Sequence, residues 1–129
     1  MRYVISFLVI FMLGCTSQYK IFKENLRGKN LFLERFGDIK KEAPKHAVLV
    51  LYNGGFKGFG GCNDYSGVFK VTKNHVHFKI KYLGTNVCQE SYNEREYLKT
   101  LVKTTNMVIK DNRVYFMNND DKILLVFKK

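Results

Sequence analysis

Short apolar runs rich in Val, Ile, Phe and Tyr recur along the chain and predict β-strands, and one of the segments alternates polar and apolar residues with a period of two. The alternation is cleanest over residues 75–81, where Val76, Phe78 and Ile80 would share one face. The opposite face of this strand would carry His75, His77, Lys79 and Lys81. Further strands are predicted over residues 30–34, 46–52, 66–72, 107–110, 113–117 and 122–127. We therefore expect a protein that is mostly β-sheet, with one sheet face exposed to water.

The hydrophobic period changes after Cys88, and residues 91–103 fit an α-helix. The apolar stripe of this helix would consist of Tyr97, Leu98, Leu101 and Val102. Ser91 and Glu94 have the spacing of a capping box, and Glu94 is expected on the exposed side. The order is a β-meander, one helix and a second β-meander. We therefore predict a small single α+β domain with a mostly antiparallel, strongly curved β-sheet.

Glycine is concentrated in residues 54–61, directly before a predicted strand. This segment contains neither a Gly-x-Gly-x-x-Gly pattern nor a Gly-Lys-Ser/Thr pattern, and no helix N-terminus follows it. A cradle for phosphate is therefore not expected. The segment is predicted to be a tight bend or bulge in which backbones approach closely.

The chain opens with a pattern that is typical of a bacterial lipoprotein signal peptide. Residues 4–13 form an almost unbroken apolar run, which is shorter than the roughly 20 apolar residues that span a bilayer. Residues 12–15 read Met-Leu-Gly-Cys and resemble the box after which a cysteine is acylated. We expect residues 1–14 to be the lipoprotein signal peptide and Cys15 to be the site of lipid attachment. An ordinary secretory peptide is the alternative.

This interpretation places the protein in the bacterial cell envelope, where acylation holds a soluble domain at a membrane surface. Thr16 and Ser17 provide no acidic retention signal after the cysteine, which favours the periplasmic face of the outer membrane. Residues 15–28 are polar and lack a clean period, so they are predicted to be a lipidated tether. Residues 29–129 would then form the folded domain.

Cys62 and Cys88 remain once Cys15 is assigned to the lipid. In an oxidising compartment, an even pair of cysteines most simply forms a disulfide. Free thiols and a metal-binding pair are the competing interpretations. Two cysteines without a second pair of ligands do not make a zinc site, so a disulfide is the preferred prediction.

The net charge of +11 at pH 7 favours anionic partners. In the envelope these are lipid headgroups, lipopolysaccharide and cell-wall polymers, whereas the expected location argues against nucleic acid. Lys79 and Lys81 are candidate binding residues, because they belong to the basic face of the strand at residues 75–81. The alternative is a solvated surface that serves only solubility.

Two segments resemble the META domain of HslJ-like envelope proteins. Residues 58–67 read G-F-G-G-C-N-D-Y-S-G and match a G-x-x-G-C-N-x-[FY]-x-G pattern, and residues 83–88 contain the downstream T-x-x-C. The helix of the family is similar to residues 96–101, although the tryptophan that usually opens its first strand is missing here. The resemblance implies a small, often lipid-anchored α+β domain with its two cysteines close in space. It also implies a link to envelope stress or tolerance of toxic compounds.

Patterns of catalytic residues are missing from the sequence. There is no Gly-x-Ser-x-Gly elbow and no His-Glu-x-x-His stretch, so no enzyme activity is expected. His75 and His77 share a strand face but have no third ligand in the pattern, so neither a metal site nor a cofactor is predicted. Asn63 and Tyr65 are candidate binding residues, because they lie in the segment that most resembles the family.

Two hypotheses follow for the function. The preferred one is a non-catalytic envelope lipoprotein that binds another envelope component, either a protein or an anionic polymer, through its basic face. The alternative is a small-ligand-binding module that sequesters compounds in an aromatic cavity between the sheet and the helix.

Overall fold

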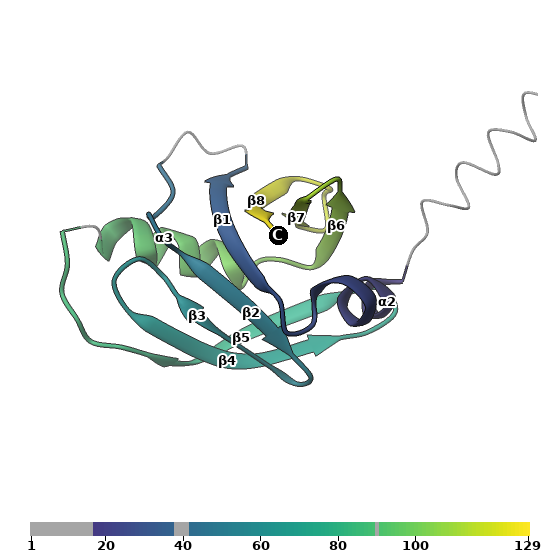
Figure 1. Ribbon diagram of the computed structural model, residues 1–129, viewed down its shortest axis with the longest axis horizontal. Helices are drawn as coiled ribbons and strands as arrows, with labels where there is room; N and C mark the ends of the chain where they lie inside the picture. Colours follow the sequence, from purple (N-terminus) through teal and green to yellow (C-terminus); the bar gives the residue numbers. More distant parts are fainter. Residues whose placement is uncertain (1–16, 38–41, 90) are drawn as a thin grey trace, which may run out of the picture.

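The computed structural model describes residues 17–37, 42–89 and 91–129 (Figure 1). The strands are β1 (Asn30–Phe36), β2 (Val48–Tyr52), β3 (Gly55–Phe59), β4 (Asp64–Val71), β5 (Val76–Leu83), β6 (Asn106–Lys110), β7 (Arg113–Met117) and β8 (Ile123–Lys128). The helices are α2 (Gln18–Ile21), the π-helical turn η1 (Phe22–Leu26) and α3 (Ser91–Leu101). The predicted signal peptide and Cys15 lie outside the described residues.

All eight strands join one antiparallel sheet in the order β5-β4-β3-β2-β1-β8-β7-β6. Strands β1–β5 form one meander and β6–β8 form the other, with α3 between them in the chain. The long-range pairing of β1 with β8 joins the two meanders, and it places Leu33 opposite Phe127. The prediction of a small α+β domain with two meanders around one helix is therefore confirmed.

The sheet curls so that its two outermost strands meet at one end. At the start of β5 the N–H of Val76 donates to the carbonyl of Thr105, just before β6, at 2.8 Å. Close by, the side-chain amide of Asn106 donates to the carbonyl of Asn74 at 3.1 Å. Helix α3 lies across the inside of the curl (Figure 1). The core therefore fills the space between α3 and the inner face of the sheet.

Aromatic rings pack on one another throughout this core. The ring of Tyr97 on α3 lies 5.8 Å from that of Tyr65 and 6.3 Å from that of Phe127, between centroids. Phe116 in turn packs against Phe127 at 4.7 Å and against Phe78 at 5.7 Å. The small-ligand hypothesis placed a cavity here, between sheet and helix. The aromatic rings of that region contact one another.

The sequence predicts a tether over residues 15–28, but Gln18–Ile21 and Phe22–Leu26 are helical and pack onto the domain. Phe22 and Leu26 are fully buried in the core. The side-chain amide of Gln18 donates to the carbonyl of Met107 at 3.1 Å, and its oxygen accepts from the N–H of Met107 at 2.6 Å. Gln18 thus pairs with the edge of β6 as a neighbouring strand would. The tether prediction is wrong for these residues because they bury apolar surface and cover a sheet edge.

We expect Gln18→Ala to lower the free energy of unfolding by about 1–2 kcal/mol, because the edge groups of Met107 lose their partner in a buried place. Hydrogen exchange at the Met107 amide should accelerate. Lys20→Ala, on the exposed side of the same helix, is the matched control and should change neither quantity. Unchanged exchange at Met107 in Gln18→Ala would show that this segment is not held by its side chain.

The middle of the glycine-rich segment forms a strand, β3, and the bends that the sequence predicts lie at its two ends. The chain turns at Gly54 and at Gly61, whose φ values of +81° and +104° favour glycine. Gly58 is needed for a different reason. A Cβ there would lie 2.1 Å from the carbonyl oxygen of Val48 and 2.5 Å from the hydroxyl of Tyr65. The missing side chain therefore lets the Tyr65 ring lie over β3.

Candidate functional site

The two segments that carry the predicted cysteines meet at one end of the sheet. Cys62 lies in the turn between β3 and β4, and Cys88 lies between β5 and α3. A disulfide joins them, with Cα atoms 6.0 Å apart. The bond fixes the chain that leads into α3 against the β3–β4 turn.

Glu94 is buried beneath this turn, so the expectation that it faces solvent is wrong. One carboxylate oxygen accepts hydrogen bonds from the backbone N–H groups of Cys62 and Asn63, at 2.9 and 2.7 Å. The other oxygen accepts from the side-chain amide of Asn63 at 2.9 Å. Hydrogen bonds to an ionised acceptor are among the stronger ones in proteins. Glu94 therefore ties α3 to the β3–β4 turn. The side chain of Ser91, the other half of the predicted capping box, lies outside the described side chains.

Asn63, a candidate binding residue, is also buried and is fully used within the protein. Its side-chain oxygen accepts from the N–H of Asn86 at 2.7 Å. Its amide group donates to the carbonyl of Asn86 at 3.1 Å as well as to Glu94. The contacts of Asn63 show a structural role, because they connect the β3–β4 turn to the segment around Cys88.

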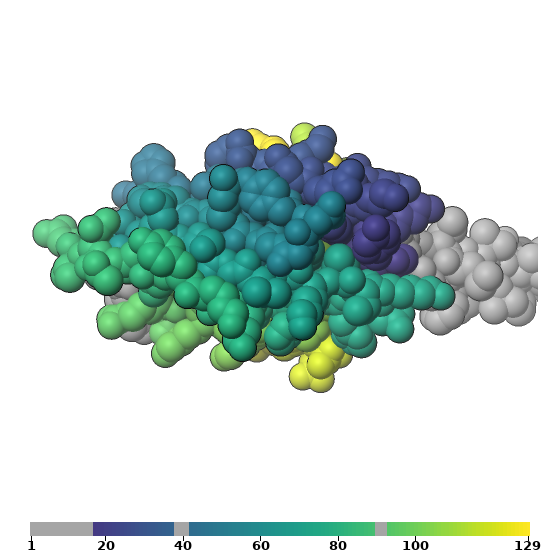
Figure 2. Space-filling model, turned by 90° about the horizontal axis from the view of Figure 1, so that it is seen from below, coloured from purple at the N-terminus to yellow at the C-terminus, as the bar shows by residue number. Residues whose placement is uncertain are grey.

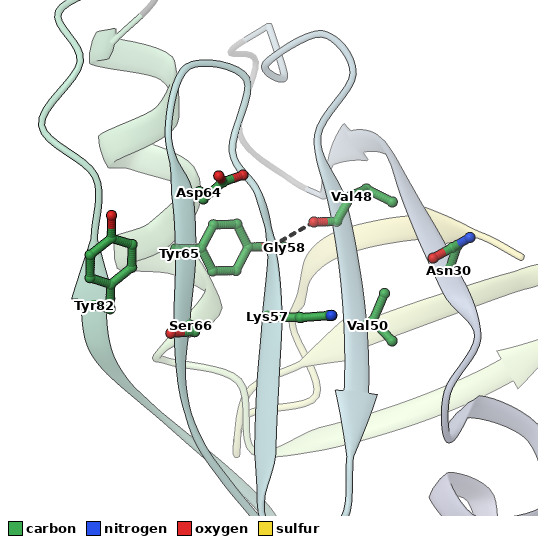
Figure 3. A pocket seen from close by; sticks show the side chains of 9 residues that line it. All are labelled: Asn30, Val48, Val50, Lys57, Gly58, Asp64, Tyr65, Ser66 and Tyr82. Atoms are coloured by element: carbon green, nitrogen blue, oxygen red, sulfur yellow. Dashed lines mark hydrogen bonds between the residues drawn. The ribbon is translucent and has the colours of Figure 1, made fainter.

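Tyr65, the other candidate from the same segment, points into the core from β4. Its hydroxyl donates to the carbonyl of Val48 at 2.9 Å, as the dashed line in Figure 3 shows, and shares a hydrogen bond with the hydroxyl of Tyr97. Burial raises the pKa of both tyrosines above the ordinary value, so both hydroxyls stay protonated. Tyr65 therefore joins β2, β4 and α3 through groups that have partners inside the protein.

The outer face of the sheet, which points away from α3, carries more exposed lysines than acids on strands β2 to β5. Strands β2 to β5 carry four exposed lysines and a single acid, Asp64. We call the four lysines the basic face: Lys57, Lys70, Lys79 and Lys81. Figure 2 views the molecule from below Figure 1, and the teal surface of these strands occupies most of that side. The candidate residues Lys79 and Lys81 thus lie in the open, next to two lysines that the sequence analysis did not single out.

The alternation of β5 explains why these lysines are exposed. Val76 and Phe78 are buried as predicted, whereas Lys79 lies on the outer face opposite Val68. The pairing shifts between Ile80 and Tyr82, so Lys81 occupies a bulge. A bulge re-aims the side chains beyond it, and here it brings Tyr82 to the outer face.

An open groove of about 550 Å³ runs across this face from β1 to β5 (Figure 3). It is lined by Asn30, Val48, Val50, Lys57, Gly58, Asp64, Tyr65, Ser66 and Tyr82. Tyr82 is 58% exposed, and the Lys57 ammonium lies 5.4 Å from the centre of the nearby Tyr52 ring. The groove therefore offers cationic and aromatic groups to a ligand on the same surface.

Two further observations concern the chemistry of the described residues. No group of three or more His, Cys, Asp or Glu side chains in this part of the chain could hold a metal ion, and His75 and His77 are simply exposed. None of the helices in the described residues has the length and hydropathy of a transmembrane span.

A family model of the META domain matches residues 23–129, which include most of η1, the disulfide cysteines Cys62 and Cys88, and α3. Two solved structures have similar folds. A DUF4847 family protein from Bacteroides vulgatus ATCC 8482 is 13% identical with a TM-score of 0.63, over 82% of this chain and 95% of that chain. A protein from Burkholderia xenovorans is 19% identical with a TM-score of 0.62, over 83% of this chain and 85% of that chain.

At these identities the solved structures share a fold with the chain. No curated protein sequence matches the chain. The family model is the stronger finding, because it extends over most of the chain and includes the β3–β4 turn with the buried network around Asn63 and Glu94. The chain belongs to the META domain family.

Proposed function

We propose that this META domain protein is a non-catalytic lipoprotein of the bacterial cell envelope that binds another envelope component. In this proposal Cys15 carries the lipid and holds the domain at the periplasmic face of the outer membrane. The component bound is an envelope protein or an anionic polymer, and binding contributes to tolerance of envelope stress or toxic compounds.

The observation that carries the proposal is the excess of positive over negative side chains on the outer face. Four lysines against Asp64 on strands β2 to β5 give this surface a positive potential that attracts anions over a distance. Tyr52 and Tyr82 add exposed rings to the same surface, and an anionic partner could contact both kinds of group at once. A surface that served only solubility would not need aromatic rings among its cations.

The buried network supports a non-catalytic role. Asn63, Tyr65 and Glu94 are the buried polar residues of the turn region, and each uses its polar atoms on partners inside the protein. What these contacts provide is a rigid junction between α3 and the strands that carry the basic face. A rigid scaffold lowers the entropy that binding costs, which suits a binding protein.

We expect Lys79→Glu combined with Lys81→Glu to reduce capture of the partner about tenfold, because charge reversal replaces attraction by repulsion at the exposed edge. The measurement is affinity purification of the intact lipidated protein from native envelopes after mild crosslinking. Raising the salt concentration should also weaken capture by the wild-type protein, because salt screens the attraction.

The matched control is Lys110→Glu combined with Lys128→Glu, which changes the net charge equally on exposed positions of β6 and β8. Capture should be retained in this control. Equal loss of capture in both variants would mean that the total charge of the protein matters instead of the basic face. Capture by Lys79→Glu/Lys81→Glu equal to that of the wild type would count against the basic face. A Cys15→Ser form tests the anchor separately, since it should leave the membrane fraction.

A further inference from the structure

A second concave surface lies on the other side of the sheet, between the edge strand β5 and the flank of α3. It is a trough of about 280 Å³ lined by Ile80, Leu83, Arg95, Leu98, Lys99 and Val102. It is separate from the groove of the outer face, because the two sets of lining residues have no member in common.

The floor of this trough is aliphatic and open to water. Leu83 is 41% exposed and Val102 is 39% exposed, and both lie beside the more deeply placed Ile80 and Leu98. The bulge in β5 places Leu83 on the inner face, opposite Tyr65, beyond the part of the sheet that α3 covers fully. Exposed aliphatic side chains that gather in one concave place commonly mark a binding site for an apolar group.

The rim of the trough is cationic. Arg95 and Lys99 are one helical turn apart on α3, so their side chains are neighbours on the helix surface. Both are exposed, and neither has an ion-pair partner among the described residues. Of the two acids that flank Arg95, Glu94 is directed inward to Cys62 and Asn63, and Glu96 is half-buried and does not line the trough. Two like charges at this spacing repel each other, and one anion placed between them would remove the repulsion.

The wall of the trough is apolar throughout, since Arg95 and Lys99 contribute their methylene stems to it. This favours an alkyl chain over a peptide. A peptide laid in the trough would bring backbone N–H and C=O groups against a wall that offers them no partner, at a cost in free energy. An alkyl chain has no such groups, and an anionic head would lie at the rim.

We propose that this trough binds one straight-chain fatty acid, with the alkyl chain along Ile80, Leu83, Leu98 and Val102 and the carboxylate between Arg95 and Lys99. The inference does not depend on the proposed role of the basic face, because it rests on different residues on the other side of the sheet. It gives the protein a second ligand class, a free carboxylate amphiphile of the kind that membrane lipids release on hydrolysis.

The test is titration of the full chain carrying Cys15→Ser with monomeric laurate, followed by methyl NMR and isothermal calorimetry. We expect saturable binding of one laurate, with methyl shifts concentrated at Ile80, Leu83, Leu98 and Val102. Arg95→Gln combined with Lys99→Gln should weaken binding about tenfold and leave the backbone spectrum folded, because both positions are exposed. Dodecyltrimethylammonium has a chain of the same length and a cationic head, and it should bind about tenfold more weakly than laurate.

The matched control is Arg35→Gln combined with Lys110→Gln, which removes two cations from a different groove, on β1 and β6 to β8. Laurate affinity should not change. The proposal is overturned if the shifts spread over both grooves, if the cationic amphiphile binds as well as laurate, or if no saturable binding occurs. Binding to phosphatidylglycerol vesicles without binding of monomeric laurate would also overturn it, in favour of a membrane contact.

Discussion

Replacing Glu94 with alanine should lower the free energy of unfolding by about 3–5 kcal/mol, a large share of the stability of a small domain. The substitution removes the acceptor of three hydrogen bonds, from two backbone N–H groups and one side-chain amide, in a place where Glu94 is only 2% exposed. Each donor left unsatisfied in the interior keeps its desolvation penalty. The measurement is urea denaturation followed by circular dichroism.

A graded series separates the loss of these hydrogen bonds from a general effect on α3. Glu94→Gln keeps one carbonyl acceptor but turns an amide group toward N–H donors. Its free energy of unfolding should therefore fall between those of the wild type and Glu94→Ala. Lys99→Ala, on the exposed side of the same helix, should stay within about 0.5 kcal/mol of the wild type. A loss below about 1 kcal/mol in Glu94→Ala would mean that water replaces the carboxylate and that the turn does not depend on it.

The architecture was predictable from the sequence where a local pattern determines it. Alternation places Val76 and Phe78 inward, and the helical stripe places Tyr97 and Leu101 in the core. The pairing of β1 with β8 has no local signal, because the partners are far apart in the chain and meet only when both meanders bury their faces on one core. Sequence periodicity identifies elements, whereas long-range packing determines how the meanders join.

Glu94 shows why the site was harder to predict than the fold. It lies three residues before Tyr97 and four before Leu98, so helical geometry puts it on the buried stripe. Its charge suggested the exposed side instead, since isolated carboxylates are rarely buried. The partners that make burial favourable, Cys62 and Asn63, come from a turn about thirty residues earlier, and their contact with Glu94 depends on the tertiary fold.

The amino-terminal segment shows a different limit. Gln18, Phe22 and Leu26 are spaced by four and share one buried side. So short a stripe, over fewer than three turns, is a weak signal beside the polar residues around it. The stabilising contribution of Gln18 also depends on the tertiary structure, because its side-chain amide pairs with the open edge of β6 at Met107. The segment is therefore part of the domain because the edge of β6, far away in the sequence, offers it a place to pair.

Removing the disulfide should destabilise the protein about as much as removing Glu94. Cys62 and Cys88 are 26 residues apart, and loop-closure entropy for that length predicts a loss of about 3–4 kcal/mol. We expect the variant that combines Cys62→Ala with Cys88→Ala to unfold at a correspondingly lower urea concentration. Wild-type protein treated with dithiothreitol should approach the stability of this variant, and the variant itself should not respond to the reductant. A response of the variant would show that the reductant acts elsewhere.

Combining this variant with Glu94→Ala gives a sharper test, because the two changes meet at Cys62. Its N–H donates to Glu94 while its sulfur bonds to Cys88, so the same turn is held twice. Once the disulfide is absent, the turn is less fixed and Glu94 stabilises it less. The combined loss should therefore be smaller than the sum of the separate losses, with a coupling of about 1 kcal/mol or more. Additive losses would mean that the carboxylate and the disulfide stabilise the junction between α3 and the β3–β4 turn independently.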